Sequence, residues 1–303
     1  LPMLSIIICT YNREKYIYQC LSRIAQNKTQ YDWEIILVNN NSTDNTHNEC
    51  ERFVNDYSPK NYNYFVEAQQ GLSYARNRGI KESHGDWLVF LDDDSMIENN
   101  YIETLGNFLQ QYPDTYAFGG QITPFFEGEP PKWLSKWSLG FVSAIDMGKE
   151  VKLFPSGKYP IGANMGISRK AINQIGLFNT SLGRTKELLL GGEEKDIFLR
   201  IHNLKKPIYY FPNICVKHCI PPKRTTKEFI KKLGYGIGVS ERLRTITINK
   251  KSFIIRIVLE LIKWIATLIL LCLYTIQGSP QKGYILVIFR KNVTKGLLGL
   301  IEE

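Results

Sequence analysis

The sequence predicts an α/β protein whose open, mostly parallel sheet is covered by helices and is followed by a basic, apolar helical tail. Three observations support this prediction. Apolar runs of strand length alternate with segments of helical spacing over the first 115 residues. Polar clusters follow three of these runs, at the strand ends where ligands bind in such sheets. Residues 223–303 carry 15 basic and 5 acidic residues, whereas residues 1–222 carry 23 and 24.

The N-terminal half contains four segments that we expect to form strands of a parallel sheet, and the first two are apolar runs typical of buried strands. The expected strands are residues 4–9, 33–38, 62–67 and 87–91. Apolar side chains at helical spacing predict helices between them. The expected helices are residues 14–27, 46–57 and 71–83. Residues 116–222 add short apolar runs at 118–122 and 208–211 and a helix near 194–203. Because no linker interrupts residues 1–222, we expect one domain there and a separate helical tail over 223–303.

Composition excludes several classes of protein. A chain that is 44% hydrophobic and 22% charged is not disordered. Its basic excess lies in the tail, which predicts contact with an anionic surface and argues against a nucleic-acid partner. The spacing of the six cysteines shows no pattern typical of a disulfide framework. The apolar run at residues 5–10 is too short for a signal peptide. We therefore expect reduced thiols and a cytoplasmic location.

Three consecutive aspartates, Asp92, Asp93 and Asp94, follow the fourth apolar run. Adjacent carboxylates repel one another where a strand leaves a low-dielectric core. A bound Mg²⁺ or Mn²⁺ would relieve this repulsion and would complete its shell with phosphate oxygens and water. The alternative is a solvated turn in which Asp94 or Ser95 caps the next helix.

Six polar residues follow the second apolar run, among them Asn39 and Asn41. Their side chains can hydrogen-bond a base or a ribose. They can equally form a turn in which Ser42 or Thr43 caps the following helix. On the third predicted helix, Arg76 can face a phosphate. The alternative for Arg76 is an exposed position on the helix surface.

A second acidic cluster, Glu193 and Glu194, follows two glycines and opens a predicted helix. Carboxylates at this position are stabilised by the helix dipole, which is the structural interpretation. The functional interpretation is a carboxylate that acts as general base on an acceptor hydroxyl. His218 follows the run at 214–217 and can ligate a metal if the fold brings it near Asp94. Otherwise it is a structural histidine.

Five segments stand in an order that resembles glycosyltransferase family 2, whose members have the GT-A fold. They are SIIICTYNR (5–13), VNNNSTD (38–44), GLSYARNRG (71–79), GDWLVFLDDD (85–94) and GGEEKDIFLR (191–200). The segments 162–169 and 216–218 also resemble family segments, so the resemblance covers about residues 4–240. It implies an inverting transferase that uses a nucleotide-activated sugar. Its nucleotide-sugar half would be about residues 1–115 and its acceptor half about 116–222.

The resemblance also assigns residues to the donor pocket. The donor-binding residues carried over are Thr10, Tyr11, Arg13, Asn39, Asn41, Arg76, Asp92 and Asp93. Asn39 stands where many members carry an aspartate that reads uracil. An amide still bonds a base, but this departure from aspartate weakens the preference for UDP over GDP. A UDP-sugar is the favoured donor, and a GDP-sugar is the alternative. Trp133 and Asn164 would face the donor sugar or the acceptor.

The implied mechanism uses a metal and a base. Asp94 would bind Mn²⁺ or Mg²⁺ with the diphosphate, and His218 could complete the metal's shell; the metal would neutralise the leaving group. Glu194 matches the usual catalytic base, with Glu193 as the other candidate. One displacement from the opposite face then inverts the anomeric carbon. Because the Gln-x-x-Arg-Trp motif of processive synthases is absent, we expect one sugar to be added per binding event.

The tail contains a strongly apolar segment, residues 253–276, that is interrupted by Arg256, Glu260 and Lys263. Its uncharged part, 264–276, has 13 residues, fewer than the ~20 that a straight membrane-spanning helix needs. We expect a helix that lies peripherally in the anionic inner face of the membrane, which suits a lipid-linked or saccharide acceptor in surface polysaccharide or glycolipid assembly. The alternatives are a helix packed on the catalytic domain and a true transmembrane helix.

Two other functions compete with this hypothesis. A nucleotidyltransferase should have a glycine-rich, basic phosphate loop after the first strand, but residues 10–15 contain no glycine. A non-catalytic nucleotide-sugar-binding adaptor has no need for Asp94 together with Glu194.

Overall fold

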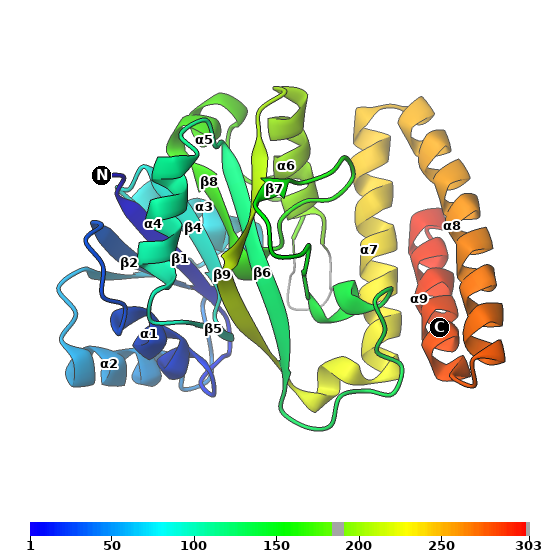
Figure 1. Cartoon of the computed structure of the whole chain (residues 1–303), viewed down its shortest axis with the longest axis horizontal. Coiled ribbons are helices and arrows are strands. Elements are labelled where there is room, and N and C mark those ends of the chain that lie inside the picture. The colour runs from blue at the N-terminus through cyan, green and yellow to red at the C-terminus, as the bar shows by residue number, and fades with distance from the viewer. Residues whose placement is uncertain (184–190, 301–303) are drawn as a thin grey trace. The chain divides into compact units, whose positions relative to one another are not determined.

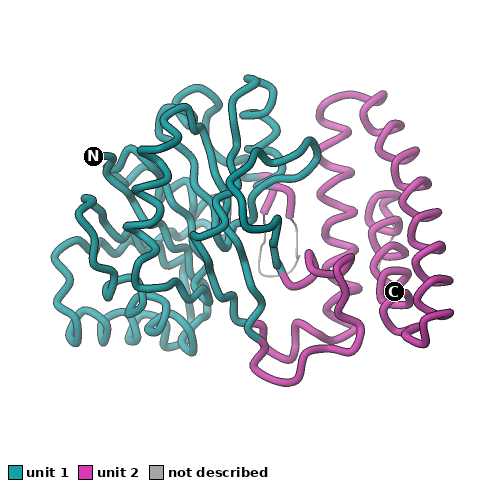
Figure 2. The backbone as a smooth tube through the Cα atoms, viewed as in Figure 1, with its two compact units in different colours: residues 1–125, 143–180, 193–219 teal, residues 126–142, 181–192, 220–303 magenta. Residues whose placement is uncertain are grey.

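A computed structural model describes residues 1–183 and 191–300, and the chain divides into two compact units (Figure 2). Unit 1 comprises Leu1–Phe125, Ser143–Thr180 and Glu193–Cys219. Unit 2 comprises Phe126–Val142, Ser181–Gly192 and Ile220–Glu303. The boundary expected at residue 222 lies beside Ile220, where the last segment of unit 2 begins, but unit 2 also takes two segments from the middle of the chain.

One mixed sheet forms the centre of unit 1 (Figure 1). In sheet order its strands are β3 (Tyr62–Val66), β2 (Trp33–Asn39), β1 (Leu4–Thr10), β4 (Trp87–Asp92), β8 (Met165–Ser168), β6 (Ala117–Phe126), β9 (Ile208–Ile220) and β5 (Ser95–Ile97), with β7 (Lys152–Leu153) beside β9. The first four strands are parallel, and Ile6 lies opposite both Ile35 and Val89. Strand β8 is antiparallel to β4 and to β6. The predicted α/β class, with a central sheet flanked by helices, is confirmed; the sheet is mixed and is parallel over β3, β2, β1 and β4.

Helices cover both faces of this sheet. One face carries α1 (Ile17–Ala25), α2 (Thr46–Tyr57) and α4 (Tyr101–Gln111), and the other carries α3 (Leu72–Glu82), α5 (Arg169–Ile175) and α6 (Glu193–Asn203). Successive strand side chains point to opposite faces. Ile6 and Ile8 of β1 therefore pack in the first core, and Ile7 packs in the second. Three short 3-10 helices occur in the connections, η1 (Leu139–Val142), η2 (Gly162–Asn164) and η3 (Pro222–Thr225).

Two helix-capping alternatives from the sequence are wrong. The aspartate triplet leads into strand β5, not into a helix, so neither Asp94 nor Ser95 is an N-cap. Helix α2 begins after Asn45, so neither Ser42 nor Thr43 caps it. Both hydroxyls bond Asn12 in the loop after β1 instead: Ser42 Oγ accepts from Asn12 N at 3.0 Å, and Thr43 Oγ1 lies 3.3 Å from Asn12 Nδ2.

Unit 2 contains three long helices, α7 (Lys227–Ile248), α8 (Lys250–Ile276) and α9 (Pro280–Leu298). Side-chain caps begin two of them, because Thr226 Oγ1 accepts from Phe229 N and Asn249 Oδ1 accepts from Ser252 N. Helix α8 is long and apolar enough to cross a membrane, and 11% of its most apolar window is buried. The tail is helical, as predicted.

Candidate active site

Two carboxylates and an imidazole gather at the end of β4. Asp92 is the last residue of β4, and Asp94 lies between β4 and β5. Strand β5 runs antiparallel to β9 and pairs Ser95 with His218. His218 Nε2 consequently lies 3.0 Å from Asp94 Oδ1 and 3.8 Å from Asp92 Oδ2. The fold thus brings His218 beside Asp94, which was the condition for its proposed role as a ligand.

These three side chains fit a divalent cation. One ligand atom from each lies within 4.8 Å of the other two, a spacing that small side-chain movements close around one ion. Carboxylate oxygens suit Mg²⁺ and Mn²⁺, and an imidazole nitrogen is also a common metal ligand. The side chains of Asp94 and His218 are buried, whereas that of Asp92 is 34% exposed. Phosphate oxygens and water can therefore approach from the side of Asp92.

Arg13 balances the acidic loop from the end of β1. Its Nε lies 3.1 Å from Asp93 Oδ1, and its Nη2 lies 3.7 Å from Asp94 Oδ2. Burial raises the pKa of Asp93 to about 7; the charge of Arg13 opposes this rise, and the charge of Asp94 adds to it. A divalent cation in this loop would act in the same direction as Arg13. Arg13 is therefore the cation that the structure places beside Asp93 and Asp94.

Glu193 and Glu194 begin α6 and share one partner, Arg76 of α3. Arg76 Nη1 lies 3.2 Å from Glu193 Oε1, and its Nη2 lies 3.2 Å from Glu194 Oε1. The side chains of Arg76 and Glu193 are each 3% exposed, whereas that of Glu194 is 17% exposed. Burial raises the pKa of Glu193 to about 8; the charge of Glu194 adds to the rise, and Arg76 opposes it. Burial thus favours the protonated form of Glu193, and Glu194 is the more accessible carboxyl group.

Arg76 links the two acidic groups of the site. Burial would lower the pKa of Arg76, but the charges of Glu194, Glu193 and Asp92 outweigh burial and raise it. Asp92 thus acts on the same guanidinium as both glutamates. The sequence predicted that Arg76 binds donor phosphate, and that role stays a prediction; the partnership with the glutamates was not foreseen.

Gly162 of η2 makes room for this ion pair. A Cβ atom at Gly162 would collide with Arg76 Nη2 and Glu194 Oε1. The family-like segment at 162–169 drew attention to Asn164, and the role of Gly162 was missed. Only the folded chain shows that η2 lies against a salt bridge between α3 and α6.

The expected nucleotide residues lie at the carboxyl ends of the parallel strands. Thr10 ends β1 and is in register with Asn39, which ends β2. Asn39 Nδ2 donates to Tyr64 Oη at 2.8 Å, and its Oδ1 accepts from Ser42 N at 2.9 Å. Asn41 is exposed and has a positive φ of 59°. The amide of Asn39 thus already has two partners, and the donor roles of Thr10, Tyr11, Asn39 and Asn41 stay predictions.

The two residues expected at the sugar or acceptor are both buried. Asn164 accepts from Tyr101 Oη at 2.6 Å and donates to the carbonyls of Gln121 and Ile214. Its side chain therefore braces the strands around η2 and is not brought to the surface of the site. Trp133 lies in unit 2, where its Nε1 donates to the carbonyl of Thr225 at 3.1 Å.

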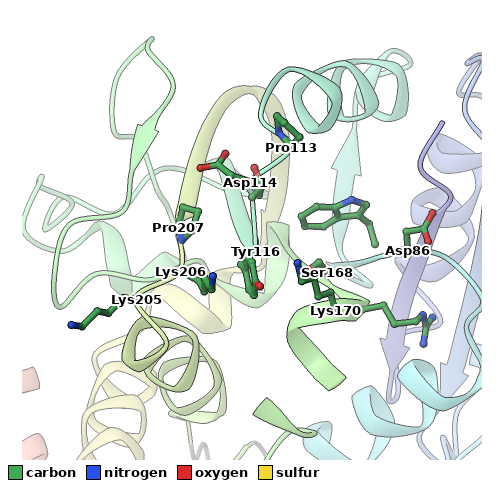
Figure 3. A pocket seen from close by; sticks show the side chains of 12 residues that line it. Asp86, Pro113, Asp114, Tyr116, Ser168, Lys170, Lys205, Lys206 and Pro207 are labelled. Atoms are coloured by element: carbon green, nitrogen blue, oxygen red, sulfur yellow. The ribbon is translucent and has the colours of Figure 1, made fainter. Parts of the chain in front are cut away.

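A cavity of about 610 Å³ lies elsewhere on unit 1, beside the first residue of β4 (Figure 3). None of the expected site residues lines it. Lys170 and Lys206 place their Nζ atoms 5.4 Å and 5.0 Å from the ring centroid of Tyr116. Burial would raise the pKa of Tyr116, but hydrogen bonds from Lys170 and Gln174 and the lysine charges lower it. This cavity is at the opposite strand end from the acidic groups and does not contribute to them.

Comparison with known proteins identifies the family. Residues 5–176 match the profile of the family described as Glycosyl transferase family 2. This match covers more than half of the chain. The chain belongs to glycosyl transferase family 2. The resemblance inferred from the five sequence segments is confirmed.

Two curated members of the family resemble this chain over most of its length. A glucosyl-dolichyl phosphate glucuronosyltransferase of Haloferax volcanii is 23% identical over 245 residues, which cover 79% of this chain and 76% of that protein. A dolichyl N-acetyl-α-D-glucosaminyl phosphate 3-β-D-2,3-diacetamido-2,3-dideoxy-β-D-glucuronosyltransferase of Methanococcus voltae is 24% identical over 254 residues, which cover 80% and 74%. The matches to several other curated relatives cover 18% to 36% of those proteins.

A solved structure has the same fold. The mannosyltransferase PcManGT from Pyrobaculum calidifontis, in complex with GDP-Man and Mn²⁺, superposes with a TM-score of 0.65 at 15% identity. The similarity covers 98% of this chain and 88% of the mannosyltransferase. The GT-A expectation for the fold of this family 2 glycosyltransferase is therefore confirmed.

Proposed function

We propose that this glycosyltransferase transfers one sugar from a nucleotide-sugar to an acceptor hydroxyl and inverts the anomeric carbon. The observation that carries the proposal is that a candidate metal-ligand set and a pair of glutamates lie in the same site, joined through Arg76. Asp92, Asp94 and His218 form a candidate ligand set for a divalent cation, and Glu193 and Glu194 form a carboxyl pair in which burial raises the pKa of Glu193. A donor diphosphate needs the first group, and an acceptor hydroxyl needs the second.

The donor side of the site would hold Mn²⁺ or Mg²⁺ through Asp92, Asp94 and His218. The cation would neutralise the charge that develops on the leaving diphosphate. Thr10, Asn39 and Arg13 would bind and orient the nucleotide from the ends of β1 and β2. A UDP-sugar is favoured by the sequence, and the GDP-Man complex of PcManGT supports GDP as the alternative.

Glu194 would act as the base. Its carboxylate would remove the proton of the acceptor hydroxyl as that oxygen attacks the anomeric carbon, and the leaving diphosphate would depart from the opposite face. Arg76 would hold the Glu194 carboxylate in place. The raised pKa of Glu193 favours the neutral form of Glu193 beside this base. Two carboxyl groups with separated protonation states are a recurring arrangement in acid–base catalysis.

The acceptor would be a lipid-linked saccharide. Two relatives carry names that describe glycosyl transfer to dolichyl phosphate-linked sugars. Unit 2 supports this assignment, because α8 is apolar over 18 residues and largely exposed. We place the enzyme in the cytoplasm, bound peripherally to the inner face of the membrane through unit 2.

Donor binding is the first test. The thermal stability of the full chain is measured with UDP-, GDP-, CMP- and dTDP-sugars, each with and without Mn²⁺. A ligand at about 100 times its Kd adds roughly 2.7 kcal/mol of stability. We expect a metal-dependent shift with one nucleotide class, which Asp94→Ala abolishes and Asp146→Ala retains. Asp146 is the matched control because its carboxylate bonds the nearby backbone N of Gly148.

Three outcomes would contradict the proposal. A shift that needs neither metal nor Asp94 would exclude the metal role. No shift with any donor, in folded protein, would favour the adaptor function. Transfer of the sugar with retained anomeric configuration, measured by NMR of the product, would exclude the single displacement.

A further inference from the structure

Helix α8 has polar residues on its buried face and apolar residues on its exposed face. Its large exposed apolar residues are Ile254, Ile255, Val258, Leu259, Leu261, Ile262, Ile265, Leu268, Ile269, Leu273 and Ile276. Its buried residues are Arg256, Glu260 and Thr267. A surface helix of a soluble protein buries its apolar face. The exposed face of α8 therefore matches hydrocarbon and not water.

The buried charges of α8 are satisfied within unit 2. Arg256 Nε donates to Glu241 of α7 at 2.9 Å, and its Nη1 donates to Glu260 at 2.8 Å. Arg290 of α9 reaches the same Glu260 at 3.1 Å. Charges in hydrocarbon are costly unless they are paired with one another. This network lets the three helices enclose their charges while α8 faces lipid.

A groove of about 370 Å³ lies beside this network, between α8, α9 and the segment that contains η1. Helices α8 and α9 run antiparallel, because Trp264 Nε1 donates to Thr294 Oγ1 and Gly283 packs on Leu271. One end of the groove therefore lies near Trp264 and Thr294, and the other lies near Leu271 and Gly283.

Two cations lie toward one end of the groove, and apolar side chains line its length, including Phe289 beside Arg290. Lys263 and Arg290 line the end nearer the ion network, whereas Leu270 and Leu286 line the end nearer the α8–α9 turn. Lys263 is exposed. Arg290 Nε is buried and has no hydrogen-bond partner among the described residues. Cations toward one end of an apolar groove match an amphiphile with an anionic head.

We propose that this groove binds a single-chain lipid phosphate. Its phosphate lies against Lys263 and Arg290, and its hydrocarbon chain runs along Leu270, Leu286 and Phe289. The lipid-facing surface of α8 makes the membrane the source of this ligand. The inference rests on the proposed function, for which the groove would hold the lipid carrier of the acceptor.

The test measures binding of farnesyl phosphate to the full chain in phosphatidylcholine nanodiscs. We expect saturable binding of farnesyl phosphate and at least about tenfold weaker binding of the neutral alcohol farnesol, equivalent to about 1.4 kcal/mol. Lys263→Gln removes a cation of the groove and should raise the Kd for farnesyl phosphate about tenfold. Ala266→Phe fills the groove and should weaken binding of the hydrocarbon chain. Arg290 is not substituted, because its loss would leave Glu260 with one fewer cation.

Two matched variants control for general effects of charge and bulk. Lys291→Gln removes an exposed cation that is adjacent to Arg290 and does not line the groove. Leu268→Phe adds bulk to α8 at an exposed position outside the groove. Both variants should bind farnesyl phosphate like the unmodified chain.

Several results would overturn the proposal. Equal binding of farnesol and farnesyl phosphate would remove the role of the cations. Equal weakening by Lys263→Gln and Lys291→Gln would indicate attraction by net charge alone. Full competition by phosphatidylglycerol would assign the groove to a phospholipid headgroup.

Failure of the proposed function has a separate signature. Asp94→Ala should lose the metal-dependent donor shift and keep farnesyl phosphate binding. Groove binding without any donor shift in the unmodified chain would contradict the proposed function alone, and the reverse result would contradict the groove alone.

Discussion

Arg76 of α3 holds the carboxylate of Glu194 at 3.2 Å, although 118 residues separate them in the sequence. The other terminal nitrogen of the same guanidinium reaches Glu193, also at 3.2 Å. One buried cation therefore positions two adjacent carboxyl groups whose environments differ. Glu193 is enclosed and tends to stay protonated, whereas Glu194 is more open. This difference is what a base next to a neutral acid requires.

Arg76→Lys should lower kcat about tenfold or more and leave the KM for the donor nearly unchanged. Lysine keeps the charge but has one nitrogen, so it cannot reproduce the fixed fork by which Nη1 and Nη2 hold the two glutamates apart. Arg78→Lys, two residues along the same helix, is the control because Arg78 makes a half-exposed pair with Glu82 and, within the described residues, no ion pair with Glu193 or Glu194. Steady-state kinetics of both variants check the prediction. Equal kcat values for the two would show that the bridging geometry does not matter.

Glu193 should make the folded state less stable as the pH rises. Burial raises its pKa to about 8, so the folded chain retains a proton that the unfolded chain releases above about pH 4.3. Stability falls with pH wherever the folded state binds more protons, so this contribution is present below pH 4.3 and is lost as the pH rises through about 8. Urea unfolding at pH 5, 6.5 and 8 measures the effect in the unmodified chain and in Glu193→Gln.

The difference between the two chains isolates Glu193. The contribution of Asp93, whose pKa is also raised, is present in both and cancels. The free energy of unfolding of Glu193→Gln minus that of the unmodified chain should increase as the pH rises from 5 to 8. A constant difference across this range would mean that Glu193 is ionised in the folded state.

Gly162→Ala should reduce activity without unfolding the chain. The added Cβ would displace Arg76 Nη2 and Glu194 Oε1, and both belong to side chains that can move. Overpacking of a buried site typically costs about 1–3 kcal/mol. Gly140→Ala is the control, since nothing lies within 4 Å of a Cβ there. We expect a loss of kcat in Gly162→Ala alone, with near-unchanged far-UV circular dichroism. Full activity of Gly162→Ala would show that catalysis does not depend on the undisturbed salt bridge between Arg76 and Glu194.

The sequence predicted the parallel half of the fold well, because β1, β2 and β4 are strongly apolar and each helix between the strands has an apolar face. The expected helix at 46–57 has the observed bounds of α2. Strand β5 could not be predicted, since its three residues are stabilised by pairing with β9, more than 100 residues away. Helix α4 was missed although its apolar side chains pack in the first core.

The sequence indicated individual candidate residues of the site, but it did not indicate which of them contact one another. The acidic character of Asp92, Asp94 and Glu194 is visible in the sequence. Which of them share a partner is not, because Arg76 and His218 reach them through the packing of α3 on α6 and of β5 on β9. The sequence also could not show that Asn164, a polar residue in a family-like segment, makes three internal hydrogen bonds.

Gly238→Ala should destabilise unit 2 even though alanine favours helices over glycine by about 1 kcal/mol. A Cβ at Gly238 of α7 would meet backbone atoms of Val293, Gly296 and Leu297 on α9. Backbone atoms cannot rotate away, so the helices must separate and lose packing along their whole contact. Close backbone approach through small residues is typical of helices that pair in membranes.

The clash should outweigh the gain in helix propensity, with a net loss of about 1–3 kcal/mol. Denaturant unfolding in detergent micelles measures it, with Gly128→Ala as the control because a Cβ there meets only Pro222 at an ordinary 3.8 Å. Flotation with anionic vesicles gives a second measurement. The fraction of Gly238→Ala that floats should fall, since Arg290 of α9 encloses the charge of Glu260 on α8. A Gly238→Ala chain that is more stable than the unmodified one would show that α7 and α9 are not held in backbone contact.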